Sequence, residues 1–155
     1  MNDQTKSRIE RTISRQRAFF ESGVTREVAF RLRYLKRLKA AIQKRETELY
    51  GAFANDFGKP KFEVYMTELG VVLEEISLVE RKLKSWCQPK RVWTPMAHMP
   101  AGSRIYSEPY GVALIMAPWN YPFNLLMAPL IGALAAGNCV VLKTGRAAAH
   151  TSSVI

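Results

Sequence analysis

Residues 108–143 read EPYGVALIMAPWNYPFNLLMAPLIGALAAGNCVVLK, and this stretch decides the fold. The short apolar run Val112–Met116 lies between a glycine and a proline, which is typical of a strand buried on both faces. Residues 125–135 are apolar nearly all round and end at a Gly-Asn stop, so they predict a packed helix. Residues 139–142 predict a second strand. This order predicts two parallel strands joined by a helix, the unit of doubly wound nucleotide-binding sheets.

The turn between that strand and helix carries one side-chain amide, Asn120, with Pro118 before it and Pro122 after it. Because each proline disfavours helical geometry in the residue before it, we expect a stiff turn that holds Asn120 rigidly. An Asn in a turn commonly bonds its own backbone. Alternatively its amide donates to an oxyanion, where one donor is worth about 100-fold to 1000-fold in rate. Spacing alone leaves both interpretations open, and by pattern alone Trp119 and Tyr121 are most simply core aromatics.

The chain upstream of this unit is predicted to be helical. One long amphipathic helix is expected from an N-cap at Thr25, and a second, packed antiparallel to it, follows the break at residues 58–60. A shorter opening helix precedes them, residues 89–102 are expected to form a loop or arm, and residues 103–107 a strand. The apolar stripe of the first long helix is Val28, Leu32, Leu35, Ile42, Leu49 and Phe53, and that of the second is Tyr65, Leu69, Val72, Leu73, Ile76, Val79, Leu83 and Trp86.

Charge offers one alternative function. The 155 residues carry a net charge of +10 with 48% hydrophobic residues, an ordinary globular composition with a basic tilt. The first long helix has a basic face that could contact phosphates, which favours a stand-alone helical module for acidic partners or nucleic acid. Acidic residues interrupt that face and no aromatic stacking surface accompanies it, so we expect a solvated face and no nucleic-acid partner. The basic face comprises Arg31, Arg33, Lys36, Arg37, Lys44 and Arg45.

The two cysteines give neither a disulfide framework nor metal-ligand spacing, which predicts a reducing, cytoplasmic compartment and no metal site. Cys139 falls in a predicted buried strand and is interpreted as structural, while His98 and His150 are expected to be isolated surface residues. Residues 1–13 are charged throughout, so no secretory signal is expected. Residues 125–142 have the length of a membrane span, but proline, glycine and asparagine divide them, and we predict none.

Four segments stand in the order found in the aldehyde dehydrogenase superfamily, which the sequence resembles: EPYGV at 108–112, PWNYP at 118–122, PLIGALAAGN at 129–138 and VVLK at 140–143. The resemblance covers nearly the whole chain and is most similar to the class 3 branch. It implies an α/β fold in three parts. Residues 1–100 form the N-terminal helical part of the cofactor domain, residues 101–110 a bridging arm strand used in oligomerisation, and residues 111–155 the start of the Rossmann-like dinucleotide-binding domain.

The resemblance also implies a chemistry. A cysteine attacks the aldehyde to give a thiohemiacetal, hydride passes to NAD or NADP, and a glutamate activates water to release the carboxylic acid. Asn120 matches the oxyanion donor, Pro118 and Trp119 the wall of the cofactor cleft, and Lys143 the lysine that bonds the adenosine ribose. The family usually continues from that lysine as Pro-Ser-Glu, whereas this chain continues as Thr-Gly-Arg. Its Arg146 could favour the 2′-phosphate of NADP, and Gly145 equally suggests a degraded loop.

The chain stops well before the family's usual extent. The nucleophilic cysteine, the general-base glutamate and the downstream Gly-rich cofactor turn have no counterparts, and only two strands of the sheet are encoded. We therefore expect an N-terminal piece of an NAD(P)-dependent enzyme that acts on a small-molecule aldehyde and is a homodimer when complete. This piece alone is expected to be inactive and marginally folded, with the apolar residues of its two strands partly exposed.

Overall fold

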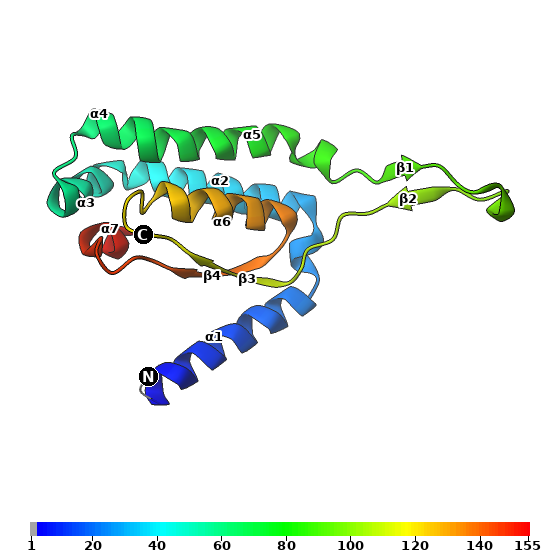
Figure 1. Cartoon of the computed structure of the whole chain (residues 1–155), viewed down its shortest axis with the longest axis horizontal. Helices are drawn as coiled ribbons and strands as arrows, with labels where there is room; N and C mark the ends of the chain where they lie inside the picture. Colours follow the sequence, from blue (N-terminus) through cyan, green and yellow to red (C-terminus); the bar gives the residue numbers. More distant parts are fainter. Residues whose placement is uncertain (1–2) are drawn as a thin grey trace.

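The computed structural model describes residues 3–155 and begins with a long helix, α1 (Asp3–Glu21). The prediction of a shorter opening helix is wrong, because α1 has 19 residues and the helix that follows the first turn has 17. None of the residues of α1 is buried, and the helix slants away from the rest of the molecule (Figure 1). Its many Arg, Gln and Glu residues favour helix by propensity, which extends it beyond its few apolar positions.

The single long helix expected from Thr25 is two helices, α2 (Val28–Lys44) and α3 (Glu46–Phe57). Thr25 is not the N-cap, because it lies in a 3-10 turn, η1 (Val24–Arg26), and the extended residue Glu27 precedes α2. The break falls at Arg45, whose φ of −99° and ψ of 12° leave the helical region. This change of direction brings α3 against the last helix of the chain.

Arg31 does not lie on the solvated basic face that was predicted for this helix. Its side chain turns inward, and only 8% of the residue is exposed. Its guanidinium donates to the carbonyl oxygens of Thr25 at 2.7 Å, Arg26 at 2.8 Å and Ala135 at 3.1 Å. These carbonyls satisfy a charge that periodicity alone would place in solvent. Arg31 therefore fastens η1 to the far end of a helix much later in the chain.

The second long helix is a run of three helical segments: α4 (Lys61–Val64), a π-helical turn η2 (Tyr65–Leu69) and α5 (Gly70–Trp86). Figure 1 shows α5 lying antiparallel to α2, as predicted. The middle of the predicted stripe is buried, at Leu69, Val72, Ile76, Val79 and Leu83, whereas its two ends, Tyr65 and Trp86, are exposed.

An extended hairpin follows α5 and projects from the molecule (Figure 1). Its strands are β1 (Lys90–Val92) and β2 (Ser103–Ile105), antiparallel with Lys90 opposite Ile105, and the short 3-10 helix η3 (Met96–His98) lies near its tip. The strand predicted at 103–107 is thus present but shorter. Its partner β1 was not predicted, because its three exposed residues have no apolar alternation.

The predicted strand–helix–strand unit is confirmed as β3 (Val112–Met116), α6 (Asn124–Ala136) and β4 (Cys139–Lys143). The strands are parallel, with Val112 opposite Cys139 and Met116 opposite Lys143. A short helix, α7 (Ala149–Val154), ends the chain. The fold is therefore α/β, with N-terminal helices followed by the first unit of a parallel sheet.

The parallel pair is only partly covered. Both faces of β3 were expected to be buried, but Leu114 is 61% exposed and Met116 is 64% exposed. Helix α6 packs against both strands, and α1 contacts them too, where Gln16 donates to the Val140 carbonyl at 3.4 Å. A two-stranded sheet has too few neighbours to cover the rest, so the expectation of partly exposed strands is confirmed.

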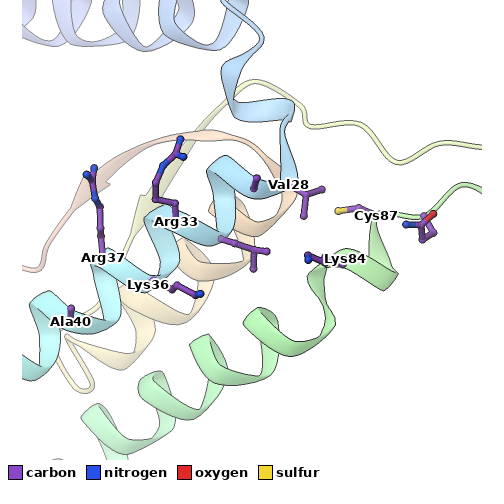
Figure 2. A pocket seen from close by; sticks show the side chains of 10 residues that line it. Val28, Arg33, Lys36, Arg37, Ala40, Lys84 and Cys87 are labelled. Atoms are coloured by element: carbon purple, nitrogen blue, oxygen red, sulfur yellow. The ribbon is translucent and has the colours of Figure 1, made fainter.

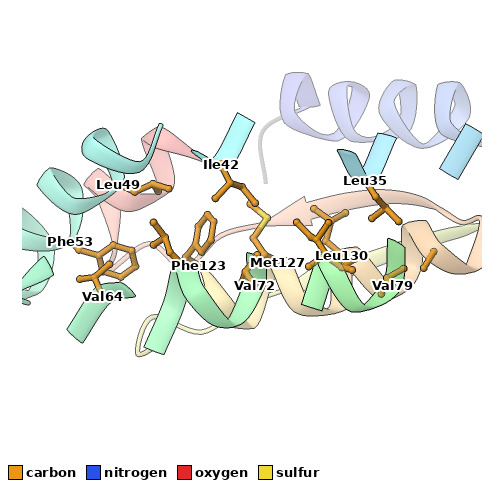
Figure 3. Packing of buried hydrophobic residues seen from close by; sticks show 14 of the residues in the cluster. Leu35, Ile42, Leu49, Phe53, Val64, Val72, Val79, Phe123, Met127 and Leu130 are labelled. Atoms are coloured by element: carbon orange, nitrogen blue, oxygen red, sulfur yellow. The ribbon is translucent and has the colours of Figure 1, made fainter. Parts of the chain in front are cut away.

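The hydrophobic core lies between α2, α5 and α6 and continues to α3 and α4 (Figure 3). Its residues include Leu35, Ile42, Leu49, Phe53, Val64, Val72, Val79, Phe123, Met127 and Leu130. Phe123, which precedes α6, is 2% exposed and anchors the start of that helix in the core. Among residues 3–155, no helix has the length and apolarity needed to cross a membrane.

Candidate active site at the carboxyl ends of the parallel strands

The carboxyl ends of β3 and β4 meet at one edge. The Ala117 N–H donates to the Lys143 carbonyl at 3.2 Å, so the ladder continues one residue past β3. Beyond it the two loops stay close, since a Cβ added to Gly145 would lie 3.4 Å from the Trp119 nitrogen and from the Pro118 carbonyl carbon. The structure thus brings together at one edge all four residues singled out from the sequence, Pro118, Trp119, Asn120 and Lys143.

These four residues are all exposed. Trp119 is 58% exposed and its neighbour Tyr121 is 40% exposed, so neither is a core aromatic here. Asn120 lies in the turn, outside α6, and its side chain makes no hydrogen bond to any of residues 3–155. The bond to its own backbone that a simple turn residue would make is absent from this described part of the chain. Its amide N–H groups are free to donate to another molecule.

Glu68, which was not predicted from the sequence, anchors the turn where it enters α6. Glu68 comes from η2 and is fully buried. One of its carboxylate oxygens accepts a hydrogen bond from the backbone N–H of Asn124 at 2.7 Å, and the Asn124 side chain donates to the Thr67 carbonyl at 3.0 Å. The other oxygen lies 3.8 Å from the Lys59 ammonium, which also sits 4.5 Å from the centre of the Tyr121 ring.

The pKa of Glu68 reflects this setting. Burial raises the pKa, and the hydrogen bond from Asn124 and the charge of Lys59 lower it by less, so the pKa stays above its ordinary value. A signal for Glu68 was present in the sequence: it lies four residues after Val64 and four before Val72, two core positions. An acid on the apolar face of a helix predicts a buried polar contact.

The loop after β4 is anchored by Asp56 of α3. Its side chain is 4% exposed and accepts hydrogen bonds from the backbone N–H groups of Thr151 at 2.7 Å and His150 at 3.1 Å, at the start of α7. The ring Nδ1 of His150 lies 2.8 Å from the same carboxylate. His150 is therefore exposed, as predicted, but the prediction that it is isolated is wrong. Ser152 donates to the Gly145 carbonyl at 3.2 Å. Together they fix the loop that begins at Lys143.

The remaining polar candidates lie away from this edge. Cys139 is 4% exposed and burial raises the pKa of its thiol, as expected of a structural cysteine. Cys87 is half-buried, and the two thiols do not form a disulfide. His98 is exposed in η3 on the hairpin. Within residues 3–155, no three His, Cys, Asp or Glu side chains are grouped so as to hold a metal ion.

A groove of about 870 Å³ lies between α2 and the end of α5, and none of the four candidate residues lines it. Figure 2 shows Lys36 and Lys84 pointing into it, while Arg33 and Arg37 point away from α5. The two guanidiniums lie over aromatic rings of α2, 5.5 Å from the centre of Phe30 and 5.4 Å from that of Tyr34. The four candidate residues therefore lie at the strand edge and not in this groove.

Comparison with known proteins identifies the family of the chain. The model of the aldehyde dehydrogenase family matches residues 1–155. The chain is 40% identical over 144 residues to aldehyde dehydrogenase family 3 member B1 of Bos taurus, covering 93% of this chain and 31% of that protein. It is 37% identical over 149 residues to the dimeric NADP-preferring aldehyde dehydrogenase of Rattus norvegicus, covering 96% of this chain and 33% of that protein.

Among solved structures, the substrate-bound state of Staphylococcus aureus AldH superposes with a TM-score of 0.92 and 41% identity. The match covers 94% of this chain and 32% of that one. The chain thus spans about a third of the length of the relatives it matches. The family model, the class 3 relatives and the shared fold lead to one conclusion: this chain belongs to the aldehyde dehydrogenase family.

Proposed function

We propose that this chain is the amino-terminal part of an NAD(P)-dependent aldehyde dehydrogenase of the class 3 branch, which oxidises a small-molecule aldehyde to a carboxylic acid. The observation that carries the proposal is the position of Asn120. Its unpaired amide lies in a proline-flanked turn at the carboxyl ends of two parallel strands. Ligands of open α/β sheets bind at that edge.

In the proposed reaction, Asn120 acts as an oxyanion donor. When a thiolate adds to the aldehyde carbon, negative charge develops on the carbonyl oxygen, and a fixed amide N–H stabilises it. Neither cysteine is a suitable nucleophile. Cys139 is buried, and Cys87 lies at the C-terminal end of α5, whereas the turn lies against η2, at the other end of that helical run. This part of the protein therefore contributes the donor and not the thiolate, and we expect it to be inactive alone.

The residues at the strand edge fit a dinucleotide. Trp119 and Lys143 are exposed, and neither side chain makes a hydrogen bond or ion pair with the rest of the described chain, residues 3–155. An unpaired ammonium suits a ribose hydroxyl, and the Pro118–Trp119 backbone with its exposed indole offers a flat wall. The chemistry that NAD or NADP supplies when bound is acceptance of a hydride. We assign Pro118 and Trp119 to the cofactor wall and Lys143 to the adenosine ribose.

The test uses the full-length product of the gene that encodes this chain. Wild-type protein is expected to oxidise aldehydes with NAD or NADP, and Asn120→Ala is expected to lower kcat by about 100-fold to 1000-fold. Cofactor affinity should not change, because the amide contacts only the oxyanion. The matched control is Lys39→Met, which removes an ion pair between α2 and α5, remote from the turn. Absence of aldehyde oxidation, or an Asn120→Ala variant with full kcat, would reject the proposal.

We further propose that the complete protein is a cytoplasmic homodimer. Its hairpin exposes large apolar residues, with Trp93 78% exposed, Met96 83% and Met99 65%, as an arm that docks on a second copy would. The two unpaired thiols suit a reducing compartment. Sedimentation of the full-length protein tests the dimer, and replacing Trp93 and Met96 by Ser should shift it toward monomer. The relatives give no support to a stand-alone basic helical module, and Arg31 of the expected basic face is buried.

A further inference from the structure

We propose that Glu68 is a positioning residue for Asn120: its buried carboxylate fixes the first residue of α6 and, through it, the turn that holds the amide. The proposal rests on the proposed function of Asn120. It adds a residue from a different helix, outside the proline-flanked turn. Four steps connect Glu68 to Asn120.

The first step is a clamp on Asn124 from two sides. Its backbone N–H is held by Glu68 at 2.7 Å, and its side-chain amide is held by the neighbouring carbonyl of Thr67 at 3.0 Å. Two bonds from consecutive residues of η2 to the same residue fix both the position and the rotation of the start of α6. No residue of the turn itself caps this helix with a side chain.

Further contacts hold the turn residues that precede Asn124. The Leu125 N–H donates to the Tyr121 carbonyl at 3.0 Å, so the residue that follows Asn120 is tied to the first turn of the helix. On the other side of Tyr121, the Lys59 ammonium lies over the ring and 3.8 Å from Glu68. Pro122 and Phe123 are buried between these contacts. Asn120 is thus the exposed residue next to a fixed segment.

The third step explains how an acidic side chain reaches the core. In the π-helical turn η2, the Gly70 N–H bonds to the carbonyl of Tyr65, five residues earlier. A Cβ on Gly70 would lie 2.8 Å from that oxygen, so glycine permits the turn. Two consecutive residues of this turn, Glu68 and Leu69, are fully buried. Such turns occur often at functional sites.

The burial of Glu68 carries an electrostatic cost. A buried carboxylate loses its hydration, and an apolar residue of similar size would avoid that cost. Here the cost is partly offset by a backbone N–H at the start of α6, the positive end of the helix, and by the ammonium of Lys59. Each of these partners lies in or against residues 121–124, directly after Asn120.

The experiment is a double-mutant cycle in the full-length enzyme. Glu68→Ala removes the acceptor and is expected to lower kcat by about 10-fold to 100-fold, because small displacements of a catalytic group have effects of this size. Glu68→Gln keeps an oxygen that can accept from Asn124, and kcat should stay within about threefold of wild type. KM for the cofactor should move by less than about threefold in both, because the loop after β4 has its own anchor in Asp56.

In an Asn120→Ala background, Glu68→Ala should lower kcat no further, because Glu68 acts only through the amide that is already absent. A purely structural role of Glu68 would instead give additive losses, and that result would overturn the proposal. A Glu68→Gln variant whose kcat falls as far as that of Glu68→Ala would also overturn the proposal. If Glu68→Ala does not fold, Asn124→Ala replaces it, because this variant loses only the bond to Thr67. Its kcat should fall by about 3-fold to 10-fold. In the Asn120→Ala background, Asn124→Ala should again have no effect on kcat.

Hydrogen exchange gives a readout that does not depend on activity. Backbone amides of residues 121–127 should exchange at least about tenfold faster in Glu68→Ala than in wild type, with Glu68→Gln close to wild type. Unchanged exchange would show that Glu68 does not hold the turn. If wild-type protein fails to oxidise aldehydes, the proposed function is rejected, and the positioning role of Glu68 with it. If wild type is active and only the cycle is additive, the role of Asn120 stands and that of Glu68 is rejected.

Discussion

Arg31 and Ala135 are joined by a hydrogen bond of 3.1 Å from the guanidinium to the carbonyl oxygen, which places a buried cation at the C-terminal end of α6. Among residues 3–155, no acidic side chain forms an ion pair with Arg31. Its charge is compensated by backbone carbonyls of η1 and of the last turn of α6, where the helix dipole favours a cation. A single side chain thus ties the N-terminal helices to the strand–helix–strand unit.

Replacing Arg31 by Lys should destabilise the protein although the charge is kept. An ammonium cannot reproduce the planar fork that reaches three carbonyls, so at least one of them is left buried and unpaired, and we expect a loss of about 2–3 kcal/mol in unfolding free energy. Urea denaturation of the full-length protein measures it. Arg33→Lys is the matched control on the exposed side of α2 and should change stability by less than about 0.5 kcal/mol. Equal effects of the two variants would contradict the role given to Arg31.

Gly137 and Gly132 should respond in opposite directions to alanine. Gly137 has φ of 93°, and a Cβ there would lie 2.8 Å from the Arg31 guanidinium carbon, so Gly137→Ala combines backbone strain with a clash and should cost about 2–4 kcal/mol. Gly132 lies inside α6 with no atom within 4 Å of the added Cβ, and Gly132→Ala should stabilise by about 0.5–1 kcal/mol. Thermal unfolding of both variants provides the comparison. A neutral Gly137→Ala would be inconsistent with the packing of Arg31.

The contribution of Asp56 should depend on pH. Burial raises its pKa, but the hydrogen bonds from Thr151 and His150 outweigh burial and leave the pKa below its ordinary value of 3.8. The folded chain therefore holds this proton less tightly than the unfolded chain does. The stabilisation is complete above the unfolded pKa, about 3.9, and is lost as pH falls through the lower folded pKa.

Asp56→Asn tests this directly. At neutral pH the variant should be less stable than wild type by about 1 kcal/mol, because α7 loses a charged cap. The difference should shrink below about pH 4, where wild-type Asp56 takes up its proton. Glu48→Gln, an exposed acid on the same helix, serves as the control and should have little effect at any pH. A difference that is constant with pH would show that the charge of Asp56 is not responsible.

Cofactor preference should depend on Arg146. Its side chain is exposed beside Gly145, three residues after Lys143, and makes no contact with an acid within residues 3–155. We expect the full-length protein to bind NADP more tightly than NAD, since a guanidinium pairs with a 2′-phosphate. Arg146→Glu should reverse the preference by repelling the phosphate and bonding the ribose hydroxyls. Stronger binding of NAD by wild type, measured by calorimetry, would reject this assignment.

The strand–helix–strand unit was predictable because local signals mark both ends of each element. Proline ends β3, a Gly-Asn pair separates α6 from β4, and parallel pairing then brings Asn120 and Lys143 to one edge. The break at Arg45 was not predictable, because neither proline nor glycine marks it. The burial of Arg31 was hidden too, since the carbonyl that it reaches at Ala135 is 104 residues away in sequence. The roles of Pro118, Trp119, Asn120 and Lys143 stay predictions.

The capping of α6 by Glu68 also limits where a cofactor's diphosphate can lie. A helix that follows the first strand of such a unit usually offers its free N–H groups to phosphate, but here a carboxylate already takes the Asn124 N–H. A second anion at that point would meet like charge. In the proposed enzyme we therefore expect another segment to neutralise the diphosphate, and the N-terminal end of α6 to face the substrate side of the cleft.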